Sequence, residues 1–247
     1  MTVVIRIDGE SQQRPAGLVS GAQLYDLAGS SPQRLFLNRE DGIDIPISPE
    51  DHLLIKGNES FVVGDSQIED NPPLRKELKP EFNGAHEIAL AHAKIEAQAL
   101  KAHDPQFPDG RLFADIPDAV DVEIFDHVRL VVQETDSYFV IPPGDAGGPI
   151  DVEECGKHDR RPPKGGAYRY RLDREKYTSE TEKISGEEIL GRAGETPPVA
   201  GKNLAEWSLN QKLRGGKRIK VDGDSVDLSA PGVERFESVR RQAQQGR

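Results

Sequence analysis

The sequence predicts an α+β protein built from repeated small modules, and three observations support this fold class. The segment Ser20–Gly29 recurs without a gap as Ser185–Gly194, which is the pattern of a chain assembled from related units. Segments with the alternation of β-strands stand before and after both copies. Only 35% of the residues are hydrophobic, whereas 24 are glycine and 18 are proline. This composition favours several small domains over one large core.

Each copy of the repeat predicts a short capped helix. Ser20 stands at the N-cap with Gln23 three residues later, and Ser185 stands in the same way before Glu188. This spacing satisfies the capping box, in which each side chain bonds the main-chain N–H of the other residue. Gly29 follows the first helix, where a left-handed residue commonly ends a helix.

Strands around these helices give the order ββαββ. Val3–Ile7 with a turn at Asp8-Gly9 predicts a hairpin before the first helix, and Tyr168–Leu172 predicts one before the second. Further strands of the first module are expected at 34–37, 43–47, 52–56 and 61–63. Pro46 marks the second of these as an edge strand. This order of elements is typical of the β-grasp fold.

The middle of the chain predicts a degenerate β-grasp unit over 81–145. Arg111–Phe113 is similar to Arg34–Phe36, and Val128–Val132 is similar to the strand at 52–56. No opening hairpin is expected, because the Ala-rich segment 83–103 predicts a long helix in its place. The apolar face of that helix would consist of Ile88, Ala91, Ile95 and Ala99.

Composition sets the remaining boundaries. The first β-grasp domain covers 1–67, and a linker over 68–80 with two adjacent prolines follows it. A connector over 146–166 precedes the third domain at 167–239, and a flexible tail covers 240–247. The predicted fold is three tandem β-grasp units, the middle one degenerate.

Charge and hydropathy exclude several classes of protein. A net charge of −11 and a pI near 5.1 argue against nucleic acid or an anionic membrane as the main partner. No apolar run reaches the length of a transmembrane helix, and the N-terminus enters a strand without a signal peptide. One cysteine, Cys155, suits a reducing compartment, so a cytoplasmic location is expected.

The sequence presents no constellation of catalytic or metal-binding residues. Cys155 and His158 form a lone Cys-x-x-His without a second pair, and a cysteine without function is the favoured interpretation. The histidines at 86, 92 and 103 lack the four-residue spacing of a zinc-binding helix. No phosphate-binding or dinucleotide-binding loop is present. We therefore expect a protein that is not an enzyme and that has no metal or cofactor of its own.

Several segments of the third module support a more specific assignment. They are Tyr168–Asp173, Lys176-Tyr177, Ile184–Leu190, Ala193-Gly194, Leu213–Gly216, Val226–Leu228 and Pro231–Phe236. Together they resemble the multiubiquitin family of bacterial ubiquitin-like proteins. The first module resembles that family more loosely, and the middle of the chain only poorly. Leu213-Arg-Gly-Gly216 spells the ending of ubiquitin, but it lies between two predicted strands and is interpreted as a hairpin turn.

The resemblance implies a protein modifier rather than a catalyst. Such modifiers are activated by an E1-like enzyme, passed to an E2-like enzyme, and trimmed or removed by a protease. ATP is consumed by the E1-like partner and is not bound by the modifier. Activation of a C-terminal carboxylate needs a slim tail, which 240–247 would provide. Removal of Arg247 would leave Gly246 as the terminus, although a terminal Gly-Gly pair is missing.

Contacts to the E1-like and E2-like enzymes are expected beside this tail. The candidate residues are Trp207, Arg235, Phe236, Arg240 and Arg241. Burial in the core is the alternative for Trp207 and Phe236. The alternative function is a non-covalent scaffold of β-grasp domains, or an assembly in which edge strands pair head-to-tail.

Overall fold

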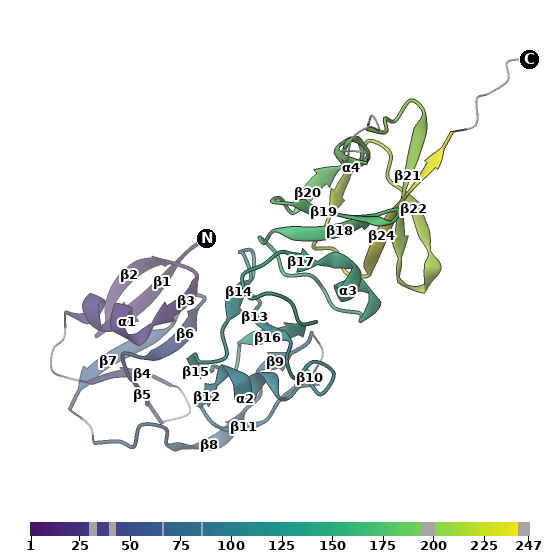
Figure 1. The fold of residues 1–247 in the computed structure, drawn as a ribbon. Coiled ribbons are helices and arrows are strands. Elements are labelled where there is room, and N and C mark those ends of the chain that lie inside the picture. The colour runs from purple at the N-terminus through teal and green to yellow at the C-terminus, as the bar shows by residue number, and fades with distance from the viewer. Residues whose placement is uncertain (30–33, 40–42, 66, 85, 194–200, 242–247) are drawn as a thin grey trace, which may run out of the picture. The chain divides into compact units, whose positions relative to one another are not determined.

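The protein is a mixed α/β protein, dominated by strands and with few, short helices (Figure 1). The computed structural model describes residues 1–29, 34–39, 43–65, 67–84, 86–193 and 201–241. The chain divides into two compact units, Met1–Val140 and Ile141–Arg247. The mixture of helices and strands agrees with the predicted α+β class, and each unit is described by itself below.

The first sheet of unit 1 has a parallel pair of strands at its centre. The first half of unit 1 contains β1 (Thr2–Ile7), β2 (Glu10–Pro15), β3 (Gly17–Ser20), α1 (Gly21–Ala28), β4 (Arg34–Leu37), β5 (Ile45–Ile47), β6 (Asp51–Ile55) and β7 (Ser60–Gly64). The order across the sheet is β2-β1-β7-β4-β5, with β1 parallel to β7. β5 is an outer strand, as Pro46 predicts. Ile5, Leu35 and Phe61 lie in the core without exposure.

The capping box predicted for the first helix is confirmed. The Ser20 hydroxyl accepts from the Gln23 N–H at 3.3 Å, and the Gln23 side chain accepts from the Ser20 N–H at 3.0 Å. Gly29 ends the helix with a positive φ of 62°, which a residue with a side chain seldom adopts. Ser185 caps the later helix by accepting from the Glu188 N–H at 3.1 Å.

The second sheet of unit 1 has the same strand order as the first. The second half of unit 1 contains β8 (Pro73–Leu78), β9 (Glu81–Phe82), β10 (His86–Glu87), β11 (Leu90–His92), β12 (Lys94–Glu96), α2 (Ala97–Lys101), β13 (Arg111–Ala114), β14 (Val122–Ile124), β15 (Arg129–Val131) and β16 (Ser137–Ile141). The order is β10-β9-β16-β13-β14, with β16 parallel to β9. The β9 and β10 pair is an opening hairpin, which the sequence interpretation missed.

The long helix predicted over 83–103 is wrong, because only the five residues of α2 are helical among the described residues of this segment. Three short strands occupy the rest of the described segment. Ile95 pairs with Leu130, and Lys94 is buried against carboxylates that come from earlier in the chain. Alanine has the highest helix propensity, but propensity is a small energy that such long-range contacts outweigh.

The two sheets of unit 1 are joined through a third one. β3 and β6 pair with each other, as do β12 and β15, and β6 pairs with β15 in parallel. The result is one four-stranded sheet of order β12-β15-β6-β3. The expected linker over 68–80 is also corrected, since β8 lies within it and pairs with β11. The first two modules therefore form one body.

Unit 2 repeats this strand order a third time. Its elements are β17 (Ile150–Asp151), α3 (Val152–Lys157), β18 (Tyr168–Leu172), β19 (Glu175–Ser179), β20 (Lys183–Ser185), α4 (Gly186–Arg192), β21 (Trp207–Leu213), η1 (Arg214–Gly216), β22 (Arg218–Lys220), β23 (Ser225–Asp227) and β24 (Val233–Arg240). β19 pairs with β18, which continues through β24 and β21 to β22. β18 and β24 are parallel, and β20 pairs with β23 in a separate sheet.

The expected connector over 146–166 is folded onto the sheet of unit 2. α3 and α4 lie on opposite sides of that sheet (Figure 1). Glu153 of α3 is buried and pairs at 2.8 Å with Arg171, which points away from the α4 side. Cys155 of the same helix is buried as well. Gly156 lies so close to β24 that an added Cβ would stand 2.0 Å from the carbonyl oxygen of Val233.

Gly156→Ala should destabilise unit 2 by about 2 kcal/mol, because the methyl group cannot fit between α3 and β24. Trp207, the only tryptophan of the chain, lies in unit 2, so its emission during chemical denaturation measures this change. Gly191→Ala is the matched control, since a Cβ there meets no atom within 4 Å. Equal midpoints for the two variants would contradict the packing of α3 on the sheet.

Candidate functional site

The root of the C-terminal segment is held at the end of the third sheet. β24 lies between β18 and β21, and Arg240, its last residue, is paired with Trp207. The main-chain N–H of Arg241 donates to the Glu206 carbonyl at 2.7 Å, and its Nε donates to the Trp207 carbonyl at 3.1 Å. The expected tail at 240–247 is therefore corrected, because Arg240 belongs to a strand and Arg241 is anchored.

Asp222 is the acceptor that organises this root. Its carboxylate accepts from the Leu209 N–H at 2.7 Å and from the Ser208 hydroxyl at 3.1 Å, and it also pairs with Lys220 and with the guanidinium of Arg241. Desolvation alone would raise the pKa of Asp222, but the Leu209 N–H, Lys220 and Ser208 outweigh it and lower the pKa. Asp222 is therefore ionised at neutral pH.

A second polar cluster includes the ring of Trp207. The Lys202 ammonium lies 4.5 Å from the centre of the Trp207 ring, a cation–π contact, and it bonds Asp173 and Ser238 at 2.7 and 2.6 Å. Desolvation would raise the pKa of Asp173, but the bonds from Lys202 and Ser238 lower it. The half-buried Trp207 ring thus lies against a fixed positive charge.

The structure separates the residues that the sequence singled out. Phe236 is fully buried and touches Tyr170 edge-on, which corrects its assignment to a partner surface. Arg235 is half-buried and pairs with Glu237 at 3.0 Å. Arg240 and Arg241 are exposed beside Trp207. Gly246 and Arg247 lie outside the described residues.

Two residues of the root were not predicted, and one predicted turn is confirmed. Asp222 and Lys202 reach the root from loops, and no spacing in the sequence connects either of them with Arg241 or Trp207. The turn over Leu213–Gly216 does join β21 to β22, with positive φ angles at Gly215 and Gly216. This segment is therefore a turn between two strands of one sheet.

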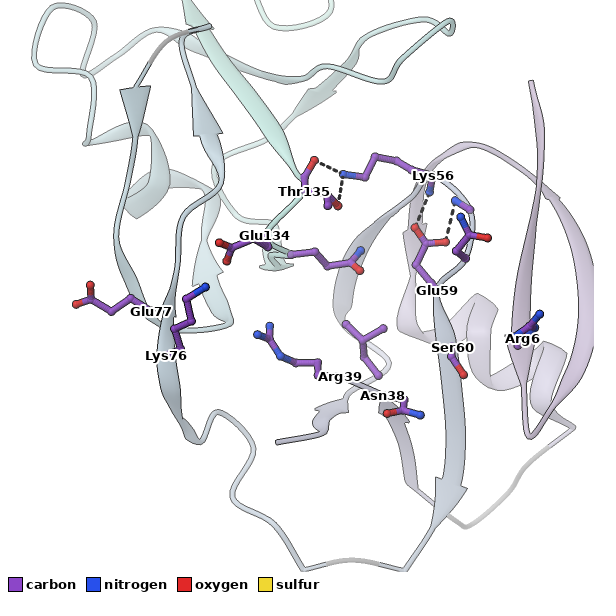
Figure 2. Close-up of a pocket in the computed structure, with 14 residues that line it drawn as sticks. Arg6, Asn38, Arg39, Lys56, Glu59, Ser60, Lys76, Glu77, Glu134 and Thr135 are labelled. Carbon is purple, nitrogen blue, oxygen red and sulfur yellow. Dashed lines mark hydrogen bonds between the residues drawn. The ribbon is translucent and has the colours of Figure 1, made fainter. Parts of the chain in front are cut away.

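Unit 1 contains a polar groove where its two halves meet (Figure 2). Its volume is about 780 Å³, and the turns that follow β6 and β15 face each other across it. Lys56 spans the groove and bonds the Thr135 carbonyl at 2.6 Å and Asp136 at 2.7 Å. Arg39, Lys76 and Glu134 are further parts of the lining. The groove thus presents charges of both signs rather than a cluster of one sign.

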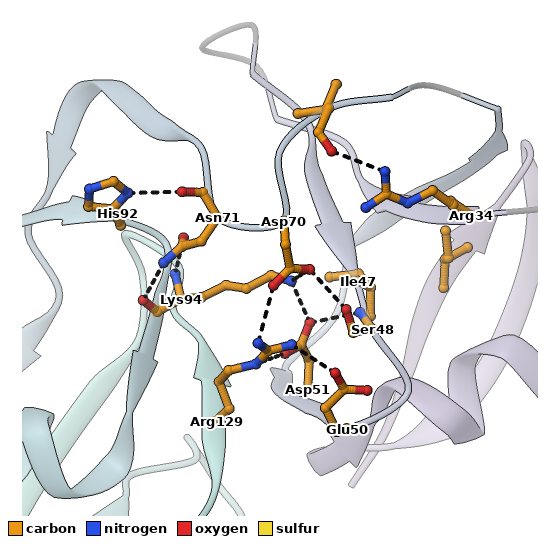
Figure 3. Close-up of polar contacts among 12 residues, drawn as sticks. Arg34, Ile47, Ser48, Glu50, Asp51, Asp70, Asn71, His92, Lys94 and Arg129 are labelled. Carbon is orange, nitrogen blue, oxygen red and sulfur yellow. Dashed lines mark hydrogen bonds and ion pairs between the residues drawn. The ribbon is translucent and has the colours of Figure 1, made fainter.

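A buried ion cluster lies beside the parallel strands that join the two halves (Figure 3). Asp51 has no exposed surface and pairs with Lys94 at 2.7 Å and with Arg129. Asp70 contacts the same two cations at 2.7 and 3.2 Å. Desolvation would raise the pKa of Asp70, but its bonds with Lys94 and Ser48 lower it. With Glu50, which also pairs with Arg129, three carboxylates and two cations connect the halves.

No protein family, curated protein or solved structure that we compared with this chain matches it. No helix among the described residues is long and apolar enough to cross a membrane. Within the same residues, no group of three His, Cys, Asp or Glu side chains is placed to hold a metal ion. The function is therefore inferred from the geometry of the chain itself.

Asp51→Asn should destabilise unit 1 by about 3 kcal/mol, because it leaves Lys94 and Arg129 without their shared buried counter-charge. Hydrogen exchange of β12 and β15 would measure the loss. Glu50→Gln is the matched control, since Glu50 also pairs with Arg129 but is 66% exposed, and its loss should cost less than about 1 kcal/mol. Equal protection in the two variants would contradict the role of Asp51.

Asp222→Asn should speed hydrogen exchange at the Arg241 amide about threefold, because a neutral side chain holds the exposed guanidinium less tightly. The lowered pKa of Asp222 determines how the anchoring of Arg241 depends on pH. Anchoring is complete above pH about 4, the ordinary range of this carboxyl, and is lost as the pH falls through its lower folded-state value. Asp224→Asn, at an exposed neighbouring acid, should change neither the exchange rate of the Arg241 amide nor its pH dependence.

Proposed function

We propose that this protein is a ubiquitin-like modifier made of three tandem β-grasp modules. The observation that carries the proposal is a strand order that all three sheets share, although the third sheet has one further strand, β17, beside β18. In each, the first and last strands are a parallel central pair. A helix stands between the second and third strands, after β3, β12 and β20 respectively. This arrangement supports membership of the multiubiquitin family.

The route of the chain in the third module supports attachment through its C-terminal segment. β24 is a central strand, so the chain leaves the sheet from its middle and not from a loose edge. Arg241, the last residue that the structure describes, is anchored by its main chain and by its side chain. Gly246 is the residue we propose for attachment, after a protease has removed Arg247. A glycine offers an E1-like enzyme a carboxylate without a side chain beside it.

The root of the segment supplies the contacts that an activating enzyme needs. Trp207 is half-buried, and Arg240 and Arg241 stand exposed next to it. An aromatic ring with neighbouring cations suits an acidic surface on the E1-like or E2-like partner. In this proposal the E1-like enzyme binds the ATP, and the modifier contributes the carboxylate and the docking surface. The protein itself performs no catalysis and works in the cytoplasm.

A non-covalent scaffold is the second candidate function, and one observation favours it. The parallel pairing of β6 with β15 fixes the first two modules in one body, which a passive tail carrier does not require. In the scaffold, this body would bind one partner while the third module binds another. The two functions differ in whether the segment after Arg241 forms a covalent bond.

Intact mass of the protein from cells that also contain its E1-like and E2-like enzymes tests the proposal. We expect a species shortened by Arg247, together with heavier adducts joined through Gly246. Deletion of Gln242–Arg247 should abolish the adducts and leave the Trp207 unfolding transition unchanged. Asp224→Asn, made at an exposed acid outside the contacts described above for Arg241, should still form adducts.

Three results would contradict the modifier or the proposed site of attachment. A single full-length mass in the presence of active enzymes would favour the scaffold. Cleavage after Gly216 would also contradict the assignment of the tail, since it removes β22, β23 and β24. Adducts from the deletion variant would place the attachment elsewhere in the chain.

A further inference from the structure

We infer that the outer strand β22 of unit 2 is a docking edge for an acidic, extended peptide. The inference concerns a surface distinct from the tail and holds whether or not the tail is conjugated. β22 is the last strand of its sheet (Figure 1), and only β21 pairs with it among the described residues. A strand with one unpaired edge can add another strand by main-chain hydrogen bonds.

The register shows which main-chain groups face outward. Leu213 donates to the Lys217 carbonyl at 2.8 Å, and Val221 donates to the Leu209 carbonyl at 2.9 Å. Because antiparallel bonds alternate, Lys217, Ile219 and Val221 direct their polar groups at β21. The N–H and C=O groups of Arg218 and Lys220 therefore point away from the sheet. They are the donors and acceptors that an added strand would meet.

The corresponding strands in unit 1 are covered to a greater degree. β5 occupies the same position in the first sheet, and its three residues Ile45, Pro46 and Ile47 are all buried. β14 occupies this position in the second sheet and is partly buried. All three residues of β22 are exposed, including the apolar Ile219 at 39%. The third module thus leaves open a strand that the other two modules shield.

Charge identifies the occupant. The segment Arg214–Lys220 contains four basic and no acidic residues, in a chain with a net charge of −11. Arg218 and Lys220 are 58% and 62% exposed, although each contacts one acid of its own unit. A second β22 paired with this edge would bring these cations together, so self-pairing is disfavoured. An acidic strand would neutralise them while an apolar side chain covers Ile219.

Fluorescence anisotropy with a labelled heptapeptide of alternating glutamate and valine tests the inference on the full-length protein. The wild-type protein should bind this probe and should not bind its lysine–valine counterpart. Lys220→Pro should weaken binding roughly tenfold, because it removes an outward N–H but no bond to β21. Lys220→Gln retains the N–H and loses only the charge, so it should weaken binding less. Lys183→Gln, an exposed lysine on β20, is the matched control and should bind as wild type.

Several outcomes would overturn the inference. If Lys220→Pro binds the probe as tightly as wild type, the probe is held by non-specific attraction to the basic residues and not by strand addition. Displacement of the probe by a single-stranded oligonucleotide at equal concentration would also show that the attraction to negative charge is non-specific. If the wild-type protein sediments as a dimer and Lys220→Pro sediments as a monomer, a second copy of the chain is the occupant of this edge. If that variant fails to fold by circular dichroism, probes N-methylated at alternate residues replace it. One methylated register must then lose binding, and equal binding of both would exclude strand addition.

Discussion

The arrangement of unit 1 depends on one buried carboxylate. Asp51 begins β6 and faces two cations from the second half of the unit, Lys94 of β12 and Arg129 of β15. Desolvation of such a cluster is costly, so its main effect is on specificity rather than on stability. Arg129 is also the residue that pairs with Asp51 in the parallel strands. A slip of the strands by one residue would direct the guanidinium away from Asp51, and the cluster therefore fixes the register.

Unit 2 has the same strand order, but different elements cover its sheets. In unit 1, the β3 and β6 pair is extended by another module. In unit 2, the corresponding β20 and β23 pair stays two-stranded among the described residues, and α3 covers the face of the main sheet opposite α4. The connector before the third module thus packs on the main sheet of unit 2. β22 and Arg240 of unit 2 are exposed.

The sequence predicted what local chemistry determines and missed what distant contacts determine. Ser20 with Gln23 and the turn at Gly215-Gly216 were recognised, because capping and tight turns need particular residues at particular positions. The strands of 83–103 were mistaken for a helix, because the burial of Lys94 depends on Asp51, more than forty residues earlier. The root of the tail was predicted only in part. Arg241 is visible in the sequence, but its partner Asp222 is one acid among 43 Asp and Glu residues.

Asp222 also connects the two surfaces that we assign to unit 2. Its carboxylate contacts Lys220 of β22 at 3.0 Å and Arg241 after β24, so two cations share one counter-charge. An acidic peptide on β22 would attract Lys220 and leave more of the Asp222 charge to Arg241. The root of the tail would then be held more tightly. Under both proposals, occupation of the edge and presentation of the tail would be coupled through this one side chain, and the coupling would be reciprocal by thermodynamic linkage.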